Sequence, residues 1–157
     1  MVGRETVVGL ISDTHVLLRP QSIDALRVSD LIIHAGDIGK LEVIDQLRAV
    51  APTIAVRGNV DIQAWAAEFP MTEAVKVGEL TFWVLHEISQ LDLDPTAAGF
   101  AAVVYGHSHQ PSVETRDGVM YINPGSAGPR RFKLPVTVAR VRFTDREIKP
   151  EIINLDV

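Results

Sequence analysis

Residues 7–15 read Val-Val-Gly-Leu-Ile-Ser-Asp-Thr-His, an apolar run that ends in Ser12, Asp13 and His15. A short apolar run rich in β-branched residues and bounded by polar ones predicts a buried strand over 7–12. Asp13 and His15 follow this strand directly, so two polar side chains that can bind metal stand just beyond its carboxyl end. The same arrangement recurs further along the chain.

The first sixty residues alternate predicted strands and helices. Helices are predicted over 22–28, with Ser22 as the N-cap, and over 41–50, where apolar residues have helical spacing. Further strands are predicted over 30–35 and 53–57. This β-α-β-α-β order is typical of parallel strands joined by right-handed helical crossovers.

The second half of the chain is rich in short strands and has few helices. Asp117-Gly118 is a hairpin turn signal, and Pro150 favours an edge position for the last strand. The predicted strands cover residues 74–77, 80–86, 102–105, 112–116, 119–122, 136–143 and 147–155. We therefore expect a single α/β domain over residues 1–157, built from two sheets.

Composition restricts the class of function. The chain has 46% hydrophobic and 22% charged residues and no apolar run long enough for a membrane span, so no membrane association is expected. Its first apolar run resembles a strand rather than a signal peptide, and it has no cysteine, which agrees with a cytoplasmic protein. The net charge of −5 disfavours nucleic acid as a partner. Without cysteine, any metal must be bound by imidazole, carboxylate and amide groups.

Polar residues follow the predicted strands at one kind of place, the carboxyl end, where open α/β sheets bind ligands. Asp13 with His15 and His107 with His109 are pairs spaced by two residues, and in extended backbone such side chains point the same way. Glycines precede Asp37, Asn59 and His107 and permit sharp turns. The candidate metal ligands are Asp13, His15, Asp37, Asn59, His86, His107 and His109.

Each piece alone has an ordinary structural explanation. A single Asp-x-His or Gly-Asp is most often a turn or a cap, and His86 alone is typical of a histidine at a strand end. The ordered set favours a metal site. His34 lies inside a predicted strand, so we interpret it as a core histidine or as a hydrogen-bond partner of a ligand carboxylate.

Together these motifs resemble the calcineurin-like metallophosphoesterase superfamily. The matching motifs are Asp13-Thr14-His15, Gly36-Asp37, Gly58-Asn59-Val60-Asp61, His86 and Gly106-His107-Ser108-His109. Asn123-Pro124-Gly125-Ser126 adds a resemblance to the small bacterial and archaeal phosphodiesterases, which are similar to the retromer metallophosphoesterase-fold subunit. The resemblance implies a four-layer α/β/β/α sandwich of two mixed sheets flanked by helices.

The resemblance also implies two divalent metal ions. One ion would be bound by Asp13, His15 and His109, the other by Asn59, His86 and His107, with Asp37 bridging the two. Mixed imidazole and oxygen ligands suit manganese, our first expectation, with iron, zinc, nickel or magnesium as alternatives. The implied reaction is phosphoester hydrolysis by a metal-bridging hydroxide, with Asp37, Asn59 and His107 as the catalytic residues.

The pattern of the superfamily is broken at two positions. Val60 stands where many members have a histidine that protonates the leaving group, so we expect good leaving groups or modest turnover. Asp61, which would partner such a histidine, is equally well explained as a turn or cap residue. Glu87 follows His86 where relatives often have glycine. Its carboxylate would either lie near the second metal or face solvent, and we favour solvent.

The expected substrate is a small phosphate ester or nucleotide, and the expected activity is that of a phosphodiesterase. Asn59 and Arg130 are the predicted substrate contacts, with Arg57 and Arg131 as further candidates, because guanidinium can bind two phosphate oxygens. The alternative is a protein-interaction scaffold with weak or no catalysis. A nuclease is a third hypothesis, which the net charge disfavours. Homodimers are common among the resembling proteins, so a homodimer is a candidate assembly.

Overall fold

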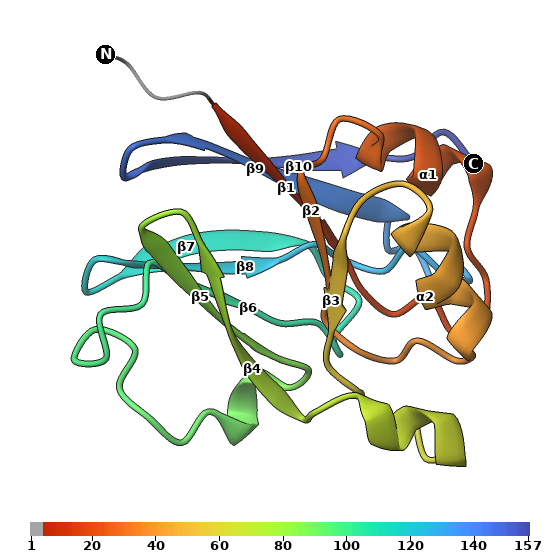
Figure 1. The fold of residues 1–157 in the computed structure, drawn as a ribbon. Helices are drawn as coiled ribbons and strands as arrows, with labels where there is room; N and C mark the ends of the chain where they lie inside the picture. The colour runs from red at the N-terminus through yellow and green to blue at the C-terminus, as the bar shows by residue number, and fades with distance from the viewer. Residues whose placement is uncertain (1–4) are drawn as a thin grey trace.

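Two five-stranded sheets pack face to face in the computed structural model, which describes residues 5–157 (Figure 1). The strand order is β10-β9-β1-β2-β3 in the first sheet and β4-β5-β6-β8-β7 in the second. In chain order the elements are β1 (Thr6–Ile11), α1 (Pro20–Leu26), β2 (Leu31–His34), α2 (Leu41–Arg48), β3 (Thr53–Ala55), η1 (Ala64–Glu68), β4 (Thr72–Val77), β5 (Leu80–Leu85), η2 (Ile88–Gln90), β6 (Ala102–Val104), β7 (Ser112–Arg116), β8 (Val119–Asn123), β9 (Thr137–Thr144) and β10 (Glu147–Asn154).

The first sheet contains the predicted β-α-β-α-β unit. Strands β1, β2 and β3 are parallel, with Ile11 paired to His34 and His34 paired to Ala55, so their carboxyl ends lie at one edge of the sheet. Strands β9 and β10 add antiparallel to β1, and β10 is the edge strand that Pro150 predicted.

The second sheet places a further set of carboxyl ends beside the first. Strands β5, β6 and β8 are parallel. Strands β7 and β8 form the predicted hairpin, and both turn residues, Asp117 and Gly118, have positive φ (50° and 81°), as a type I′ turn requires. The two parallel sets bring the ends of β1, β2, β3, β5 and β6 together.

The expected sandwich of two mixed sheets is confirmed, and its two outer faces are covered differently. Apolar residues of both sheets, such as Leu10, Phe82 and Val104, form the core between them. Helices α1 and α2 cover the outer face of the first sheet through Leu26 and Leu47. The outer face of the second sheet is covered by η2 and the loop after it instead of an α-helix.

One helix start differs from the prediction. Helix α1 begins at Pro20 with Arg19 at the N-cap, and the buried Ser22 lies inside the helix rather than capping it. Proline suits this first position because it has no N–H group to leave unpaired. Within residues 5–157, no helix is long and apolar enough to cross a membrane.

Candidate metal centre

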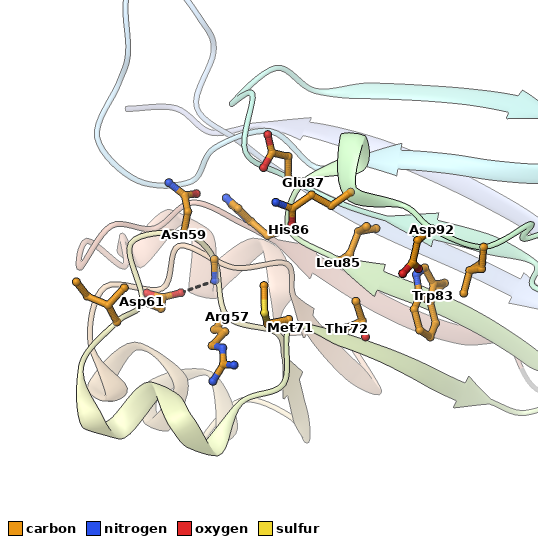
Figure 2. Close-up of a pocket in the computed structure, with 14 residues that line it drawn as sticks. Arg57, Asn59, Asp61, Met71, Thr72, Trp83, Leu85, His86, Glu87 and Asp92 are labelled. Carbon is orange, nitrogen blue, oxygen red and sulfur yellow. Dashed lines mark hydrogen bonds between the residues drawn. The ribbon is translucent and has the colours of Figure 1, made fainter.

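The two sheets bring the predicted ligands together at their common edge. Asp13 and His15 follow β1, Asp37 follows β2, Asn59 follows β3, His86 follows β5, and His107 and His109 follow β6. Six of them form two groups, Asp13, His15 and His109 (the first ligand group) and Asp37, His86 and His107 (the second ligand group). Within each group one ligand atom per residue lies within 4.8 Å of the others. Asn59 lines a cleft together with His86 of the second group (Figure 2).

The carboxylate of Asp13 is held by one oxygen and presents the other to the centre. Its Oδ2 accepts hydrogen bonds from Ser12 Oγ (2.7 Å) and the His107 amide (3.1 Å). Its Oδ1 lies 3.4 Å from His109 Nε2 and 3.7 Å from both His15 Nε2 and His86 Nε2. Asp13 is therefore oriented before any ligand binds.

Asp37 belongs to the second ligand group and also reaches the first. Its Oδ1 accepts a hydrogen bond from the Val60 amide (3.1 Å). Its Oδ2 lies 3.2 Å from His86 Nε2 and 3.5 Å from His15 Nε2. One oxygen thus faces a ring nitrogen of each group.

His86 was the ligand with the weakest motif, and its hydrogen bonding strengthens the case for it. Its Nδ1 lies 2.8 Å from the Ala35 carbonyl, which can only accept, so Nδ1 carries the proton and donates. In the neutral ring, Nε2 then has its lone pair directed at the centre, and a carbonyl partner of this kind is typical of metal-binding histidine.

The donor set fits a divalent metal. Among the described residues, the buried side-chain atoms that lack a hydrogen-bond partner include Asp13 Oδ1 and His86 Nε2, which face each other across the centre. A buried polar atom without a partner is costly, so such atoms need a ligand. Mixed imidazole and carboxylate donors suit borderline ions such as manganese, iron and zinc.

Electrostatic coupling within the centre shifts several pKa values. Burial acts to raise the pKa of Asp13, but the His109 and His15 rings outweigh it and hold that pKa well below its usual range. The Asp13 carboxylate raises the pKa of His15. Burial acts to lower the pKa of His86, but the Asp37 carboxylate outweighs this and raises it. The site therefore stabilises positive charge. A bound metal ion would supply that charge in place of protons on the histidines.

The local backbone differs from the extended conformation that the paired spacing suggested. Asp13, His15, Asp37, His107 and His109 all have φ between 45° and 72°, in the left-handed region. Non-glycine residues in sparsely populated regions cost about 1–3 kcal/mol each and cluster at functional sites. The side chains therefore converge through left-handed turns rather than through strand alternation.

Two of the three glycines before these motifs have a different role from the one predicted. Gly36 has φ +104° and does permit a turn. A Cβ at Gly58 would lie 2.2 Å from Asp37 Oδ1, and a Cβ at Gly106 would lie 2.6 Å from Asp13 Oδ2. These two glycines make room for the carboxylates, whereas the prediction assigned them a turn.

His34 is a core histidine, as predicted, but its partners are not ligand carboxylates. Its Nδ1 accepts from the Gly36 amide (3.1 Å), so Nε2 donates to Thr14 Oγ1 (3.1 Å), which in turn donates to the Ile38 carbonyl (2.8 Å). Burial lowers the pKa of His34 to about 4, so the ring stays neutral. This chain ties the loop after β1 to the loop after β2.

Asp61 has a structural role. Its carboxylate is buried and accepts hydrogen bonds from the amides of Ile38 (3.0 Å), Gly39 (3.0 Å) and Gly58 (2.8 Å). It therefore fixes the loop that carries Asn59 against the loop that carries Asp37. Of the two explanations that the sequence allowed, the turn-stabilising one agrees with these bonds.

Glu87 and Asn123 border the second ligand group. The Glu87 carboxylate lies 3.4 Å from His107 Nε2 while its side chain stays 33% exposed, so it lies near the second ligand group and is also partly in solvent. Asn123 shapes the loop beside the centre: its Nδ2 donates to the Gly106 carbonyl and Ser108 Oγ, and its Oδ1 accepts from the Gly125 amide.

The three candidate arginines lie on opposite sides of the centre. Arg57 lines the cleft beside Asn59, a cavity of about 570 Å³ (Figure 2). Arg130 and Arg131 line a cavity of about 290 Å³ with His15 and His109. The Arg130 guanidinium also donates to the Leu134 and Val157 carbonyls (both 3.4 Å).

Sequence reasoning missed two residues beside the centre. Ser12 orients Asp13, and its place between strand and ligand was a usable signal. Trp83 lines the 570 Å³ cleft. The sequence of its strand does not indicate this position, because alternation of apolar and polar residues does not show which residues lie across from a side chain.

Known proteins share this sequence pattern. The sequence profile of the calcineurin-like phosphoesterase superfamily domain matches residues 7–146. A probable metallophosphoesterase of Methanothermobacter thermautotrophicus is 29% identical over 160 residues, covering 94% of this chain and 92% of the relative. A probable metallophosphoesterase of Methanocaldococcus jannaschii is 30% identical over 139 residues, covering 80% and 70%.

Solved structures share the fold. The structure described as that of a novel archaeal phosphodiesterase has a TM-score of 0.75 at 25% identity and covers 94% of this chain and 100% of its own. Vacuolar protein sorting 29 of Cryptosporidium parvum also has a TM-score of 0.75, at 18% identity, and covers 96% and 98%. The chain belongs to the calcineurin-like phosphoesterase superfamily.

Proposed function

We propose that this chain is a dinuclear metal-dependent phosphodiesterase that hydrolyses small phosphate esters or nucleotides. The observation that carries the proposal is the position of Asp37, whose Oδ2 faces His15 Nε2 at 3.5 Å and His86 Nε2 at 3.2 Å. A carboxylate oxygen between two ligand groups is placed to bridge two ions. Two divalent ions, manganese first among the candidates, would supply the Lewis acidity and positive charge that phosphoester hydrolysis needs.

The residues divide into roles by their exposure. In the proposal, Asp13, His15 and His109 bind one ion, Asn59, His86 and His107 bind the other, and Asp37 bridges them. Asn59 and His107 are the exposed members, so an incoming phosphate ester meets them first. Arg130 approaches from the side of His15 and His109, where its guanidinium can bind a phosphoryl oxygen.

A metal add-back experiment tests the proposal. The purified protein is stripped with chelator, reloaded with manganese, iron, zinc, nickel or magnesium, and assayed with bis-p-nitrophenyl phosphate while metal content is measured by mass spectrometry. We expect two ions per chain and hydrolysis that depends on them. If the protein binds metal stoichiometrically but hydrolyses the diester with none of the five ions, the proposed enzymatic activity is contradicted and only the metal centre is supported.

A protein-interaction scaffold is the second candidate. It is favoured by Val60, which cannot donate a proton, and by the fold shared with vacuolar protein sorting 29. Affinity capture separates the two: a stoichiometric partner whose binding is unchanged by His107→Ala, in a protein without hydrolytic activity, supports the scaffold. Hydrolysis that His107→Ala abolishes supports the enzyme.

Cytoplasmic location and a homodimeric state remain predictions of this proposal. Light scattering on the purified chain measures the second directly. A mass of twice 17.2 kDa would support the candidate homodimer, and a mass of 17.2 kDa would contradict it.

A further inference from the structure

We propose that the cleft beside the second ligand group is a subsite for an aromatic or heteroaromatic substituent of the phosphate ester. This inference rests on the proposed function, because it assumes that phosphate binds at the metal centre. It adds the class of substrate: a phosphodiester in which at least one ester group has a planar ring.

The cleft begins at the metal centre and leads away from it. Asn59, His86 and Glu87 lie at one end, and Trp83 and Asp92 lie at the other, with Leu85 and Met71 between them (Figure 2). Its volume of about 570 Å³ falls within the range of about 300–1,000 Å³ that is typical of small-molecule sites. A phosphate bound at Asn59 would therefore direct one of its ester groups along this cleft.

The walls of the cleft suit a flat apolar group. Met71, Trp83, Leu85 and Leu93 all line it. The Met71 side chain is 56% exposed, and exposure of an apolar side chain to water is unfavourable. An aromatic ligand would cover it, and contacts between sulfur and aromatic rings are favourable. These four side chains give the cleft an apolar wall that continues away from the metal centre.

Trp83 is a rigid part of that wall. Its indole stacks on Phe100 with ring centroids 5.4 Å apart and an interplanar angle of 8°. Phe100 covers one face of the indole, and another part of the Trp83 side chain lines the cleft. A ring fixed in this way binds another aromatic group without first losing side-chain freedom.

The charges of the cleft disfavour a second phosphate as its occupant. Two carboxylates, Glu87 and Asp92, and one guanidinium, Arg57, line the cleft. The Asp61 carboxylate also lines it but is occupied by three backbone amides. An additional anionic group would meet net negative charge. A neutral ring matches both the apolar wall and this balance.

The cavity on the opposite side of the centre has the opposite character. It is about 290 Å³ and is lined by His15, His109, Pro129, Arg130 and Arg131. It is smaller, carries two guanidinium groups and has no aromatic residue apart from the imidazoles. A bulky ring therefore fits the Trp83 side, and an anionic oxygen fits the arginine side.

Binding of two phosphonates tests the subsite without relying on turnover. Calorimetric titration of the manganese-loaded protein with phenylphosphonate and methylphosphonate, whose C–P bonds resist hydrolysis, measures the contribution of the ring alone. We expect phenylphosphonate to bind at least about tenfold more tightly, in line with burial of an aromatic ring. Equal affinities would overturn the subsite.

Variants locate the preference. Met71→Ala and Trp83→Ala should reduce the affinity ratio to about threefold or less and leave methylphosphonate binding unchanged. Met71 is exposed, so its variant stays informative even where loss of the Phe100 stack unfolds Trp83→Ala. Val28→Ala is the matched control, since Val28 is 52% exposed and does not line the cleft. An unchanged ratio in Met71→Ala overturns the proposal.

The same titration separates this inference from the proposed function. A ring preference that Met71→Ala removes, in a protein that hydrolyses no diester, supports the subsite and contradicts the phosphodiesterase. Hydrolysis of bis-p-nitrophenyl phosphate with equal affinity for both phosphonates supports the phosphodiesterase and contradicts the subsite.

Discussion

The two ligand groups of the centre are chemically alike but differ in their surroundings. In the first, the side chains of Asp13 and His109 are almost fully buried, 0% and 3% exposed, and that of His15 is 24% exposed. In the second, Asp37 and His86 are buried but His107 is 43% exposed, and the cleft with Asn59 opens beside it. The first group is thus the more enclosed of the two. We expect it to retain an ion more strongly and the more open second group to be more accessible to a substrate.

Asp37→Asn is expected to have the largest effect, because it removes the feature that the two groups share. Loss of the negative oxygen between His15 and His86 should weaken metal binding in both groups and reduce hydrolysis by more than about 100-fold, beyond the 10–100-fold typical of a supporting partner. Metal content and diester hydrolysis measure this. Asp45→Asn, at an exposed carboxylate of α2, is the matched control. Loss of only one ion would contradict the bridging role.

Asp61→Asn should come next, because it disturbs the second group without touching a metal. The two Asp61 oxygens accept from three backbone amides, and in asparagine an NH₂ group would replace one of these oxygens. At least one amide would then lose its acceptor, at a cost of about 1–3 kcal/mol. We expect a loss of activity of about 10–100-fold together with lower stability toward urea. Asp24→Asn, at an exposed carboxylate of α1, controls for the change of charge. Unaltered urea stability would contradict the loop-fixing role.

His109→Ala and His107→Ala compare the two groups within one motif. The buried His109 should contribute more to metal affinity than the exposed His107, by about tenfold or 1.4 kcal/mol, because water competes less in the enclosed group. Competition with a chelator measures the affinities. The reverse order would mean that burial does not decide which ion is retained.

Val60→His should have the smallest effect. The Val60 amide donates to Asp37 Oδ1, so the backbone at this position is already fixed at the centre, but the side chain is partly exposed. A histidine there is expected to raise the hydrolysis of esters with poor leaving groups a few-fold, well below the ~10²–10⁴-fold of an optimised acid. Dimethyl phosphate and bis-p-nitrophenyl phosphate serve as the test and control substrates. Equal gains on both would exclude proton donation as the cause.

The convergence of the candidate ligand residues was predictable from the sequence for a clear reason. A parallel strand ends at a sheet edge, and the polar residue after an apolar run is placed there by chain connectivity alone. Asp13, Asp37 and His107 all follow this rule. His86 follows it too, although its decisive support, the bond from Nδ1 to the Ala35 carbonyl, links residues 51 positions apart.

The errors also have a common cause. Extended backbone was expected at Asp13 and His15, yet both have positive φ, because hydrogen bonds to the Gly36 and Asp37 carbonyls of the neighbouring loop determine the conformation. The contact of the partly exposed Glu87 with His107 likewise joins the loops after two different strands, β5 and β6. Local spacing does not carry such information.

The sequence by itself determined the family, the order of strands and helices, and the identity of the candidate ligands, because strand periodicity and short motifs are local properties. Tertiary structure decided which oxygen of each carboxylate faces the centre, why Asp61 is needed, and that Trp83 and Met71 form a cleft beside His86. These features arise where loops from two sheets meet. Such contacts depend on packing across the sandwich, which no single stretch of the chain encodes.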